Sequence, residues 1–357
     1  MELKDLGFTE RWEALFAPHG AEGLVPARVV RSDRGSALVA TAAGIVRAKP
    51  SVRLLKAARG PGDLPAVGDW TAVLAREDLD VPRMEAVLAR AGAITRGDPA
   101  KGAEMQVLAA NVDTVCVVHP IAEAPNLRRI ERELTLAWDS GAVPVVVLTK
   151  ADLSADPEGA GEAVGAIAIG VEVLRVNALS AEGVLPLLSR LAPRRTAALI
   201  GPSGAGKSTI INALLGERRQ ETREIRVRDG RGRHTTVARE LVVLPGGGLL
   251  IDTPGLRALA LTGSDEGIAS VFPEIEALAE VCRYRDCAHE AEPGCAVRAA
   301  VEAGEVPAER LASYRKLVRE AEVVAMKTDA RLRAEEDRKW KSIRLAARDF
   351  YKRTGKK

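Results

Sequence analysis

A glycine-rich segment in the middle of the chain limits the possible folds more than any other feature. Residues 201–208 read GPSGAGKS and match the pattern G-x-x-x-x-G-K-[ST] in full. An apolar run at 197–200 precedes this segment, and a helical pattern follows it from Ser208 to Leu214. A strand that leads through such a turn into a helix presents backbone N–H groups and a positive helix terminus to phosphate. The chain is therefore predicted to contain an α/β domain that binds a nucleotide.

The residues of this phosphate loop have separate roles. Glycines let the backbone N–H groups curl around phosphate oxygens, Lys207 brings a positive charge to the outer phosphates, and Ser208 offers its hydroxyl to Mg²⁺. The alternative is a glycine-rich turn with a chance Lys-Ser pair, and the flanking strand and helix argue against it. The loop alone does not distinguish ATP from GTP. We expect nucleotide contacts from the loop and the residue after it: Gly201, Pro202, Ser203, Gly204, Ala205, Gly206, Lys207, Ser208 and Thr209.

A second candidate phosphate contact is the sequence DTPG at residues 252–255, where the apolar run 249–251 ends. Asp252 can hold Mg²⁺ through water, and the N–H of Gly255 can sense the γ-phosphate. On its own, this motif fits a strand that ends in a Pro-Gly turn equally well. Its place downstream of the phosphate loop favours the phosphate contact.

The polar, glycine-rich stretch 229–236 lies between the two phosphate motifs. Thr236 is expected to bring its hydroxyl to Mg²⁺, with Thr235 as an alternative. Many nucleotide-hydrolysing switches position the attacking water with a Gln after the D-x-x-G motif, but this chain has Leu256 there. His234 is therefore the candidate to orient water, and a surface-loop histidine is its alternative. A low intrinsic rate, completed by a partner, is expected.

A candidate guanine-reading motif, TKAD at residues 149–152, follows the apolar run 143–148. The carboxylate of Asp152 can accept hydrogen bonds from guanine N1–H and N2–H₂, whereas adenine would leave that carboxylate unpaired. The alkyl stem of Lys150 can lie over the base, and Thr149 completes the motif. The alternative is an Asp that caps a helix N-terminus. Together with the phosphate loop, the motif favours GTP over ATP.

A further contact to the base is expected after the next predicted strand, residues 171–176. The backbone N–H of Ala178 can reach guanine O6. Asn177 stands where many GTPases have Ser, so the role of its side chain stays open.

The guanine motif precedes the phosphate loop, which is the reverse of the order in ordinary small GTPases. A circular permutation retains the sheet and moves the chain ends. The strand before Gly255 then leads directly into the C-terminal region, so the bound nucleotide could move that region.

The rest of the chain divides around this α/β region. Short β-like runs at 27–30, 37–40, 70–74 and 85–89, broken by Gly and Pro, predict a small barrel, and a short amphipathic helix is expected before it at residues 8–16. Strands alternate with helical patterns from residue 107 to 261, which predicts a parallel sheet covered on both faces. We expect four regions: an N-terminal helical extension (1–25), the barrel (26–95), the permuted nucleotide-binding domain (96–263) and a C-terminal domain with a basic helical tail (264–357).

A cluster of metal-ligand residues lies in the C-terminal region. Three cysteines and a histidine within one short segment form a closed tetrahedral ligand set, which predicts one structural zinc ion with no open catalytic position. The alternative is three unrelated buried cysteines beside a surface histidine. The candidate ligands are Cys282, Cys287, His289 and Cys295.

Charge and hydropathy bear on the partners of the chain and on its compartment. The net charge is +3, but Lys and Arg far outnumber Asp and Glu from residue 326 to 357, and five arginines lie within 223–233. Both segments could contact RNA phosphates, and a solvated charged face is the alternative. No apolar run is long enough to cross a membrane, and no secretory leader opens the chain. We expect a cytoplasmic monomer that has no membrane partner.

These features together closely resemble the bacterial family of small-ribosomal-subunit-dependent GTPase A proteins, which are circularly permuted GTPases. The resemblance covers nearly the whole chain and includes the sequence AANVD at 109–113, GRHTT at 232–236, the apolar Leu256 and the Glu292-Pro293 pair in the Cys/His segment. It implies an OB-fold-like barrel, a permuted P-loop GTPase domain and a zinc-binding helical domain. It also implies GTP hydrolysis stimulated by the small (30S) ribosomal subunit, contact with its rRNA, and a role in late maturation of that subunit.

Two other functions remain open from the residues alone. A P-loop ATPase or kinase would need a different base pocket, so nucleotide competition at Asp152 would distinguish it. A non-catalytic RNA-binding zinc protein would use nucleotide only as a structural ligand, and negligible turnover with small subunits would favour it.

Overall fold

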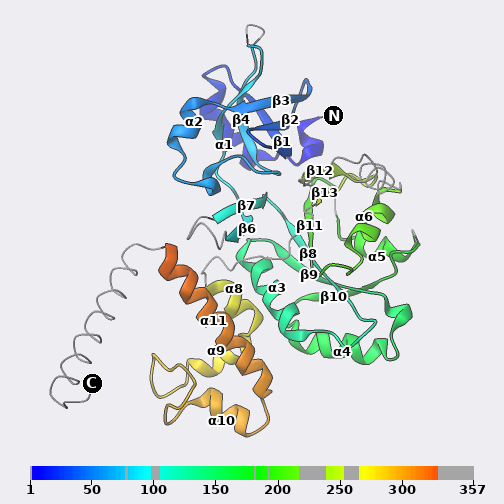
Figure 1. The fold of residues 1–357 in the computed structure, drawn as a ribbon, viewed down its shortest axis with the longest axis vertical. Helices are drawn as coiled ribbons and strands as arrows, with labels where there is room; N and C mark the ends of the chain where they lie inside the picture. Colours follow the sequence, from blue (N-terminus) through cyan, green and yellow to red (C-terminus); the bar gives the residue numbers. More distant parts are fainter. Residues whose placement is uncertain are drawn as a thin grey trace, which may run out of the picture.

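The computed structural model describes residues 2–76, 79–97, 105–180, 182–191, 193–216, 239–252 and 265–328. A β-barrel, an α/β layered region and a group of C-terminal helices lie side by side (Figure 1). Within these ranges, no helix is long and apolar enough to span a bilayer.

The barrel is closed by five strands in the order β1-β2-β3-β5-β4, with β4 pairing back onto β1. Small apolar side chains such as Ala27, Val29 and Val39 fill its interior, which suits a chain with only 3% aromatic residues. Outside the barrel, Phe8 and Trp12 pack against Trp70 with ring centroids 4.8 and 6.2 Å apart, which fixes the N-terminal helices on the barrel wall. The elements of this part are η1 (Leu3–Leu6), α1 (Glu10–Gly20), β1 (Val25–Asp33), β2 (Ser36–Thr41), β3 (Gly44–Pro50), α2 (Val52–Ala57), η2 (Pro61–Asp63), β4 (Trp70–Leu74) and β5 (Arg83–Val87).

A two-stranded hairpin of β6 (Ala93–Gly97) and β7 (Met105–Ala110) connects the barrel to the α/β region. Gly68, with φ +93°, lies so close to it that a Cβ there would be 2.1 Å from the carbonyl oxygen of Ala110. The boundary we expect between residues 95 and 96 lies inside β6.

The sheet of the α/β region has the strand order β10-β9-β8-β11-β13-β12. Its first five strands run parallel, as predicted, but β12 runs antiparallel to β13. The direction of β12 departs from the predicted parallel sheet because a tight turn at residues 244–248 joins β12 to β13, and a short turn cannot return a strand in parallel. The strands are β8 (Thr114–Pro120), β9 (Val143–Thr149), β10 (Glu172–Val176), β11 (Thr196–Ile200), β12 (Glu240–Val243) and β13 (Leu249–Asp252).

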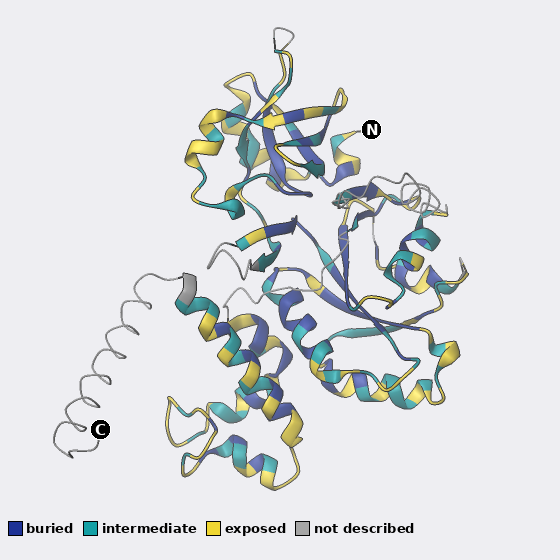
Figure 2. Ribbon diagram, viewed as in Figure 1, coloured by how far each residue is buried: buried dark blue, intermediate teal, exposed yellow. Residues whose placement is uncertain are grey.

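Helices cover both faces of this sheet, whose central strands are mostly buried (Figure 2). On one face, Val115 and Val117 of β8 share an apolar cluster with Ile130 and Leu134 of α3. On the other face, the alternating residues Cys116 and Val118 join the cluster that contains α6. The helices are α3 (Leu127–Asp139), η3 (Ala151–Leu153), α4 (Pro157–Ile167), η4 (Glu182–Val184), α5 (Leu185–Leu188) and α6 (Lys207–Leu215).

The C-terminal helices pack on α3. A Cβ at Gly267 would lie 2.7 Å from the carbonyl oxygen of Thr135 and 2.1 Å from Oδ1 of Asp139, so α8 can approach α3 this closely only with glycine there. The helix predicted around 308–327 is present as α11. The elements are α8 (Asp265–Val271), α9 (Pro273–Ala279), α10 (Ala296–Glu302) and α11 (Ala308–Thr328).

Candidate functional site

The phosphate loop joins the end of β11 to the start of α6, as the sequence predicts. Gly201 has φ +136°, and a Cβ there would lie 2.1 Å from the carbonyl oxygen of Val118 on the neighbouring strand. Gly204 and Gly206 also have positive φ, of +79° and +91°, and Gly206 is the N-cap of α6. The loop therefore follows a course that requires glycine at these positions.

The amino group of Lys207 lies within the loop. Its Nζ donates to the carbonyl oxygens of Gly201 at 2.7 Å and Pro202 at 2.6 Å. Ser208 is half-buried and Thr209 is exposed. The positive charge is thus held at the point where a phosphate would meet the loop's N–H groups.

Thr149 connects the guanine motif to the phosphate loop. Its Oγ1 donates to the carbonyl oxygen of Ala205 at 2.7 Å, although the two residues lie far apart in the chain. The side chain is buried, so this bond is shielded from water. Sequence reasoning assigned Thr149 to the motif but missed this link, because no local pattern reveals its partner.

The rest of the guanine motif turns sharply away from β9. Lys150 has φ +58°, and both Lys150 and Asp152 are exposed. The carboxylate that caps α4 belongs to Asp156, whose Oδ1 accepts from the N–H of Gly159 at 2.9 Å. The capping alternative therefore does not account for Asp152, which lies in the short helix η3 directly after β9.

Asn177 and Ala178 form a turn after β10, next to β9 in the sheet. Oδ1 of Asn177 accepts from the N–H of Leu179 at 3.0 Å. The side chain thus shapes the turn.

All of these segments lie at one edge of the sheet. The base motifs follow β9 and β10, the phosphate loop follows β11, and the half-buried Asp252 ends the neighbouring β13. Ligands of open α/β sheets bind at the carboxyl ends of the strands. His234, Thr235, Thr236, Gly255 and Leu256 lie outside the described residues.

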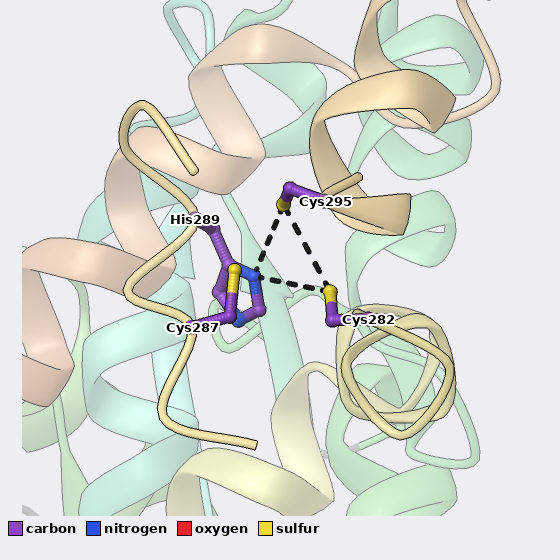
Figure 3. Close-up of side chains that lie close together, drawn as sticks. All are labelled: Cys282, Cys287, His289 and Cys295. Carbon is purple, nitrogen blue, oxygen red and sulfur yellow. Dashed lines mark hydrogen bonds between the residues drawn. The ribbon is translucent and has the colours of Figure 1, made fainter. Parts of the chain in front are cut away.

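The predicted metal cluster forms a compact set in the C-terminal region (Figure 3). All four ligand atoms lie within 4.8 Å of one another. Sγ of Cys282 is 3.9 Å from Sγ of Cys295, and Nδ1 of His289 is 3.7 and 3.4 Å from these two sulfurs. Tetrahedral zinc with ordinary bond lengths would place sulfur about 3.8 Å from sulfur and about 3.6 Å from nitrogen. The donor set therefore fits zinc in both chemistry and spacing.

Glu292 organises the loop that carries two of these ligands. Its carboxylate accepts from the N–H groups of Ala288 at 3.0 Å, Glu290 at 2.8 Å and Ala291 at 3.0 Å. Hydrogen bonds from backbone N–H groups, its own included, lower the pKa of Glu292 to about 2. The sequence pointed to Glu292 only through the family resemblance and did not reveal this role.

The chain matches known proteins over nearly its whole length. A family model described as RsgA GTPase matches residues 87–262, and one described as 50S ribosome-binding GTPase matches residues 196–344. The small ribosomal subunit biogenesis GTPase RsgA of Streptomyces coelicolor is 49% identical, with 95% of this chain and 92% of that protein covered. The protein with the same name from Opitutus terrae is 46% identical, with 96% of each chain covered.

Two solved structures share the fold. YjeQ from Thermotoga maritima has a TM-score of 0.61 at 23% identity, with 84% of this chain and 98% of that chain covered. YloQ, described as a circularly permuted GTPase, has a TM-score of 0.58 at 22% identity, with coverage of 84% and 95%. The permuted arrangement that the motif order predicts is thus the fold of this chain.

Proposed function

The chain belongs to the RsgA GTPase family, and we propose that it hydrolyses GTP to GDP and phosphate during late maturation of the small ribosomal subunit. The observation that carries this proposal is the bond between Thr149 and Ala205, which joins the guanine motif to the phosphate loop. A site that reads base and phosphate together is what a guanine-nucleotide switch needs. The near full-length similarity to small-subunit biogenesis GTPases gives the ribosomal role.

The proposed site divides the nucleotide among three groups of residues. Asp152 reads the guanine edge, the stem of Lys150 lies along the base, and the turn at Asn177 and Ala178 covers O6. The phosphate loop, residues 201–209, holds the phosphates through its N–H groups and Lys207. Mg²⁺ would be held by Ser208, Thr236 and Asp252, with Gly255 contacting the γ-phosphate.

Turnover with and without purified small ribosomal subunits tests the proposal. We expect slow GTP hydrolysis by the chain alone and a large increase when subunits are added. Large subunits serve as the control. Negligible turnover in both samples would favour an RNA-binding zinc protein that uses nucleotide as a structural ligand.

Base selectivity separates GTP from ATP chemistry. In Asp152→Asn, an amide N–H₂ would face the N–H donors of guanine, so GDP affinity should fall about 10–100-fold. Xanthine presents a carbonyl in place of the 2-amino group, so XDP should bind this variant better than it binds the wild type. If ATP competes with GDP equally in both proteins, the chain is an ATPase instead.

His234 is the proposed group that orients the attacking water, because Leu256 cannot do so. His234→Ala should lose subunit-stimulated hydrolysis while it retains GTP affinity, measured by single-turnover kinetics and equilibrium binding. His119→Ala does not serve as the comparison because that side chain is buried. The comparison is His19→Ala, at a half-buried position in the last turn of α1, outside the proposed site. Unchanged stimulated turnover in His234→Ala would exclude the role.

We further propose one structural zinc ion per chain on Cys282, Cys287, His289 and Cys295, and a monomer that acts in the cytoplasm, where ribosomes assemble. Zinc would hold the loop between α9 and α10 together and would take no part in hydrolysis. Metal analysis of the purified protein should give about one zinc per chain. The basic segments 223–233 and 326–357 are the proposed contacts to rRNA phosphates.

A further inference from the structure

The roles proposed above leave one buried hydrogen bond between a histidine and a carboxylate unexplained. Nε2 of His119, near the end of β8, is 2.7 Å from Oε2 of Glu133 on α3. Their side chains are only 3% and 8% exposed. Nε of Arg129 donates to the other carboxylate oxygen of Glu133 at 2.9 Å, one helical turn away. Glu133 is therefore held from both sides.

The end of β8 is the spacer between the two nucleotide motifs. In the sheet, β8 lies between β9, which carries the guanine motif, and β11, which carries the phosphate loop. Val118 of β8 lies close to the phosphate loop, since a Cβ at Gly201 would be only 2.1 Å from its carbonyl oxygen. The N–H of Ile121 donates to the carbonyl oxygen of Thr149 at 2.9 Å. Residues on both sides of His119 thus contact the two motifs.

Backbone ladders to β9 and β11 fix β8 within the sheet, whereas its position against α3 depends on side-chain contacts. Val115 and Val117 pack against α3 through apolar contacts, which are non-directional and tolerate small shifts. The bond between His119 and Glu133 depends on distance and angle, and burial strengthens it. It is therefore a directional contact between the end of β8 and α3.

We propose that His119 and Glu133 are positioning residues that set the distance between the phosphate loop and the guanine motif, and thereby the affinity for both GTP and GDP. The inference rests on the proposed function, since it concerns the same site. The pair touches neither base nor phosphate. Its loss should weaken binding of the two nucleotides alike and leave the chemical step unchanged at saturating GTP.

A matched control lies on the same helix. Glu131 is also buried, with 3% of its side chain exposed, but its Oε1 accepts from NH1 of Arg310 on α11 at 2.9 Å. Glu131→Gln therefore disturbs a buried pair of α3 that faces away from the nucleotide site. A purely structural role for His119 would make the two substitutions behave alike.

The experiment compares GDP and GTP affinity, melting temperature, and KM and kcat in the presence of small subunits. His119→Leu retains bulk but loses the bond, and we expect about tenfold weaker binding of both nucleotides and a KM raised to match, with kcat unchanged. His119→Gln, whose amide can still donate to Glu133, should recover affinity to within about threefold of the wild type. Glu131→Gln should lower the melting temperature without weakening either nucleotide.

Several results would overturn the inference. Wild-type affinity in folded His119→Leu, or an equal loss in Glu131→Gln, would show that the pair is only structural. If His119→Leu does not fold, Glu133→Gln should still weaken the binding of both nucleotides about threefold, because a neutral hydrogen bond replaces a charge-assisted one. Unchanged affinity in Glu133→Gln would also overturn the inference. A wild-type chain that binds no guanine nucleotide would overturn the proposed function, and this inference with it.

Discussion

Gly201 shows how a single residue fixes the nucleotide site. Its φ of +136° and the carbonyl oxygen of Val118, 2.1 Å from the position of a Cβ, both exclude a side chain. Gly201→Ala should push the phosphate loop away from β8. A displacement of about 1 Å can cost about 100-fold in function, so we expect GDP affinity to fall by at least that factor in a calorimetric titration.

The control for this substitution is Gly161→Ala in α4, where a Cβ meets open space. Alanine in a helix interior should stabilise the fold by about 0.5–1 kcal/mol and leave GDP affinity unchanged. Wild-type binding by Gly201→Ala would mean that the loop tolerates the displacement.

Glu292 supports the candidate metal cluster by hydrogen bonding to the backbone of its loop, and it is not itself one of the four candidate ligands. Its three hydrogen bonds hold the loop that carries Cys287 and His289. Glu292→Ala should lower zinc affinity about 10–100-fold, as loss of a supporting residue does at other metal sites, measured by competition with a chelator. Glu290→Ala removes an exposed carboxylate of the same loop and should bind zinc as the wild type does. Equal affinity in both variants would contradict the role of Glu292.

At the scale of helices and strands, short sequence patterns correctly predicted the elements that depend only on their own residues. The apolar runs 143–148 and 197–200 correspond to β9 and β11, and the Gly-rich loop lies between β11 and α6. The antiparallel direction of β12 was missed because it depends on the turn that follows the strand and not on the strand's own residues. Thr149 and Ala205, or His119 and Glu133, meet only after the sheet has formed, so no periodicity reveals these contacts.

Arg310 ties four elements of the fold together. Its guanidinium donates to Glu131 on α3, to Glu274 on α9, and to the carbonyl oxygens of Val271 and Ile167. Burial raises the pKa of Glu131 despite hydrogen bonds from Ser313 and Arg310. Glu131 therefore depends on its partner to stay charged in the interior.

Arg310→Met should cost about 3–5 kcal/mol of unfolding free energy, because it leaves a buried carboxylate without its cation. Urea denaturation measures the loss. The double variant Arg310→Met/Glu131→Leu should recover part of it, since no buried charge remains unpaired on α3. Arg298→Met removes an exposed pair with Glu302 and should change stability by less than about 0.5 kcal/mol. A loss of that small size in Arg310→Met would show that water reaches Glu131.

At the scale of the whole molecule, the nucleotide site is joined to both neighbouring parts. On one side, β12 continues the sheet into the barrel through the pairing of Arg31 with Glu240. On the other side, α3 contacts the C-terminal helices through Glu131 and through Arg132, which donates to Glu320 on α11. Direct contacts therefore join the nucleotide-binding domain to the barrel and to the C-terminal helices.

Arg28 makes a buried contact between the barrel and the nucleotide-binding sheet. From β1 it donates to the carbonyl oxygens of Leu6 and Gly68, and through NH2 to Oγ1 of Thr196 at 2.8 Å, the first residue of the strand that ends in the phosphate loop. Burial lowers the pKa of Arg28 to about 10, partly offset by the charges of Asp113 and Asp69, so the guanidinium remains charged near neutral pH.

Arg28→Met should therefore uncouple the two parts. The substitution removes the guanidinium donor from the carbonyl oxygen of Leu6 and from Oγ1 of Thr196, each at about 1–3 kcal/mol. The carbonyl oxygen of Gly68 keeps the hydrogen bond from the Asn111 amide. We expect the barrel to unfold at a lower temperature than the nucleotide-binding domain, so that one calorimetric transition becomes two and GDP raises only the upper one. Arg47→Met, which removes an exposed barrel arginine paired with Asp33, should retain the wild-type profile. A single transition in Arg28→Met, shifted as a whole by GDP, would mean that the remaining contacts, among them the β1–β12 pairing and the bond from Asn111 to Gly68, suffice to couple the barrel to the nucleotide site.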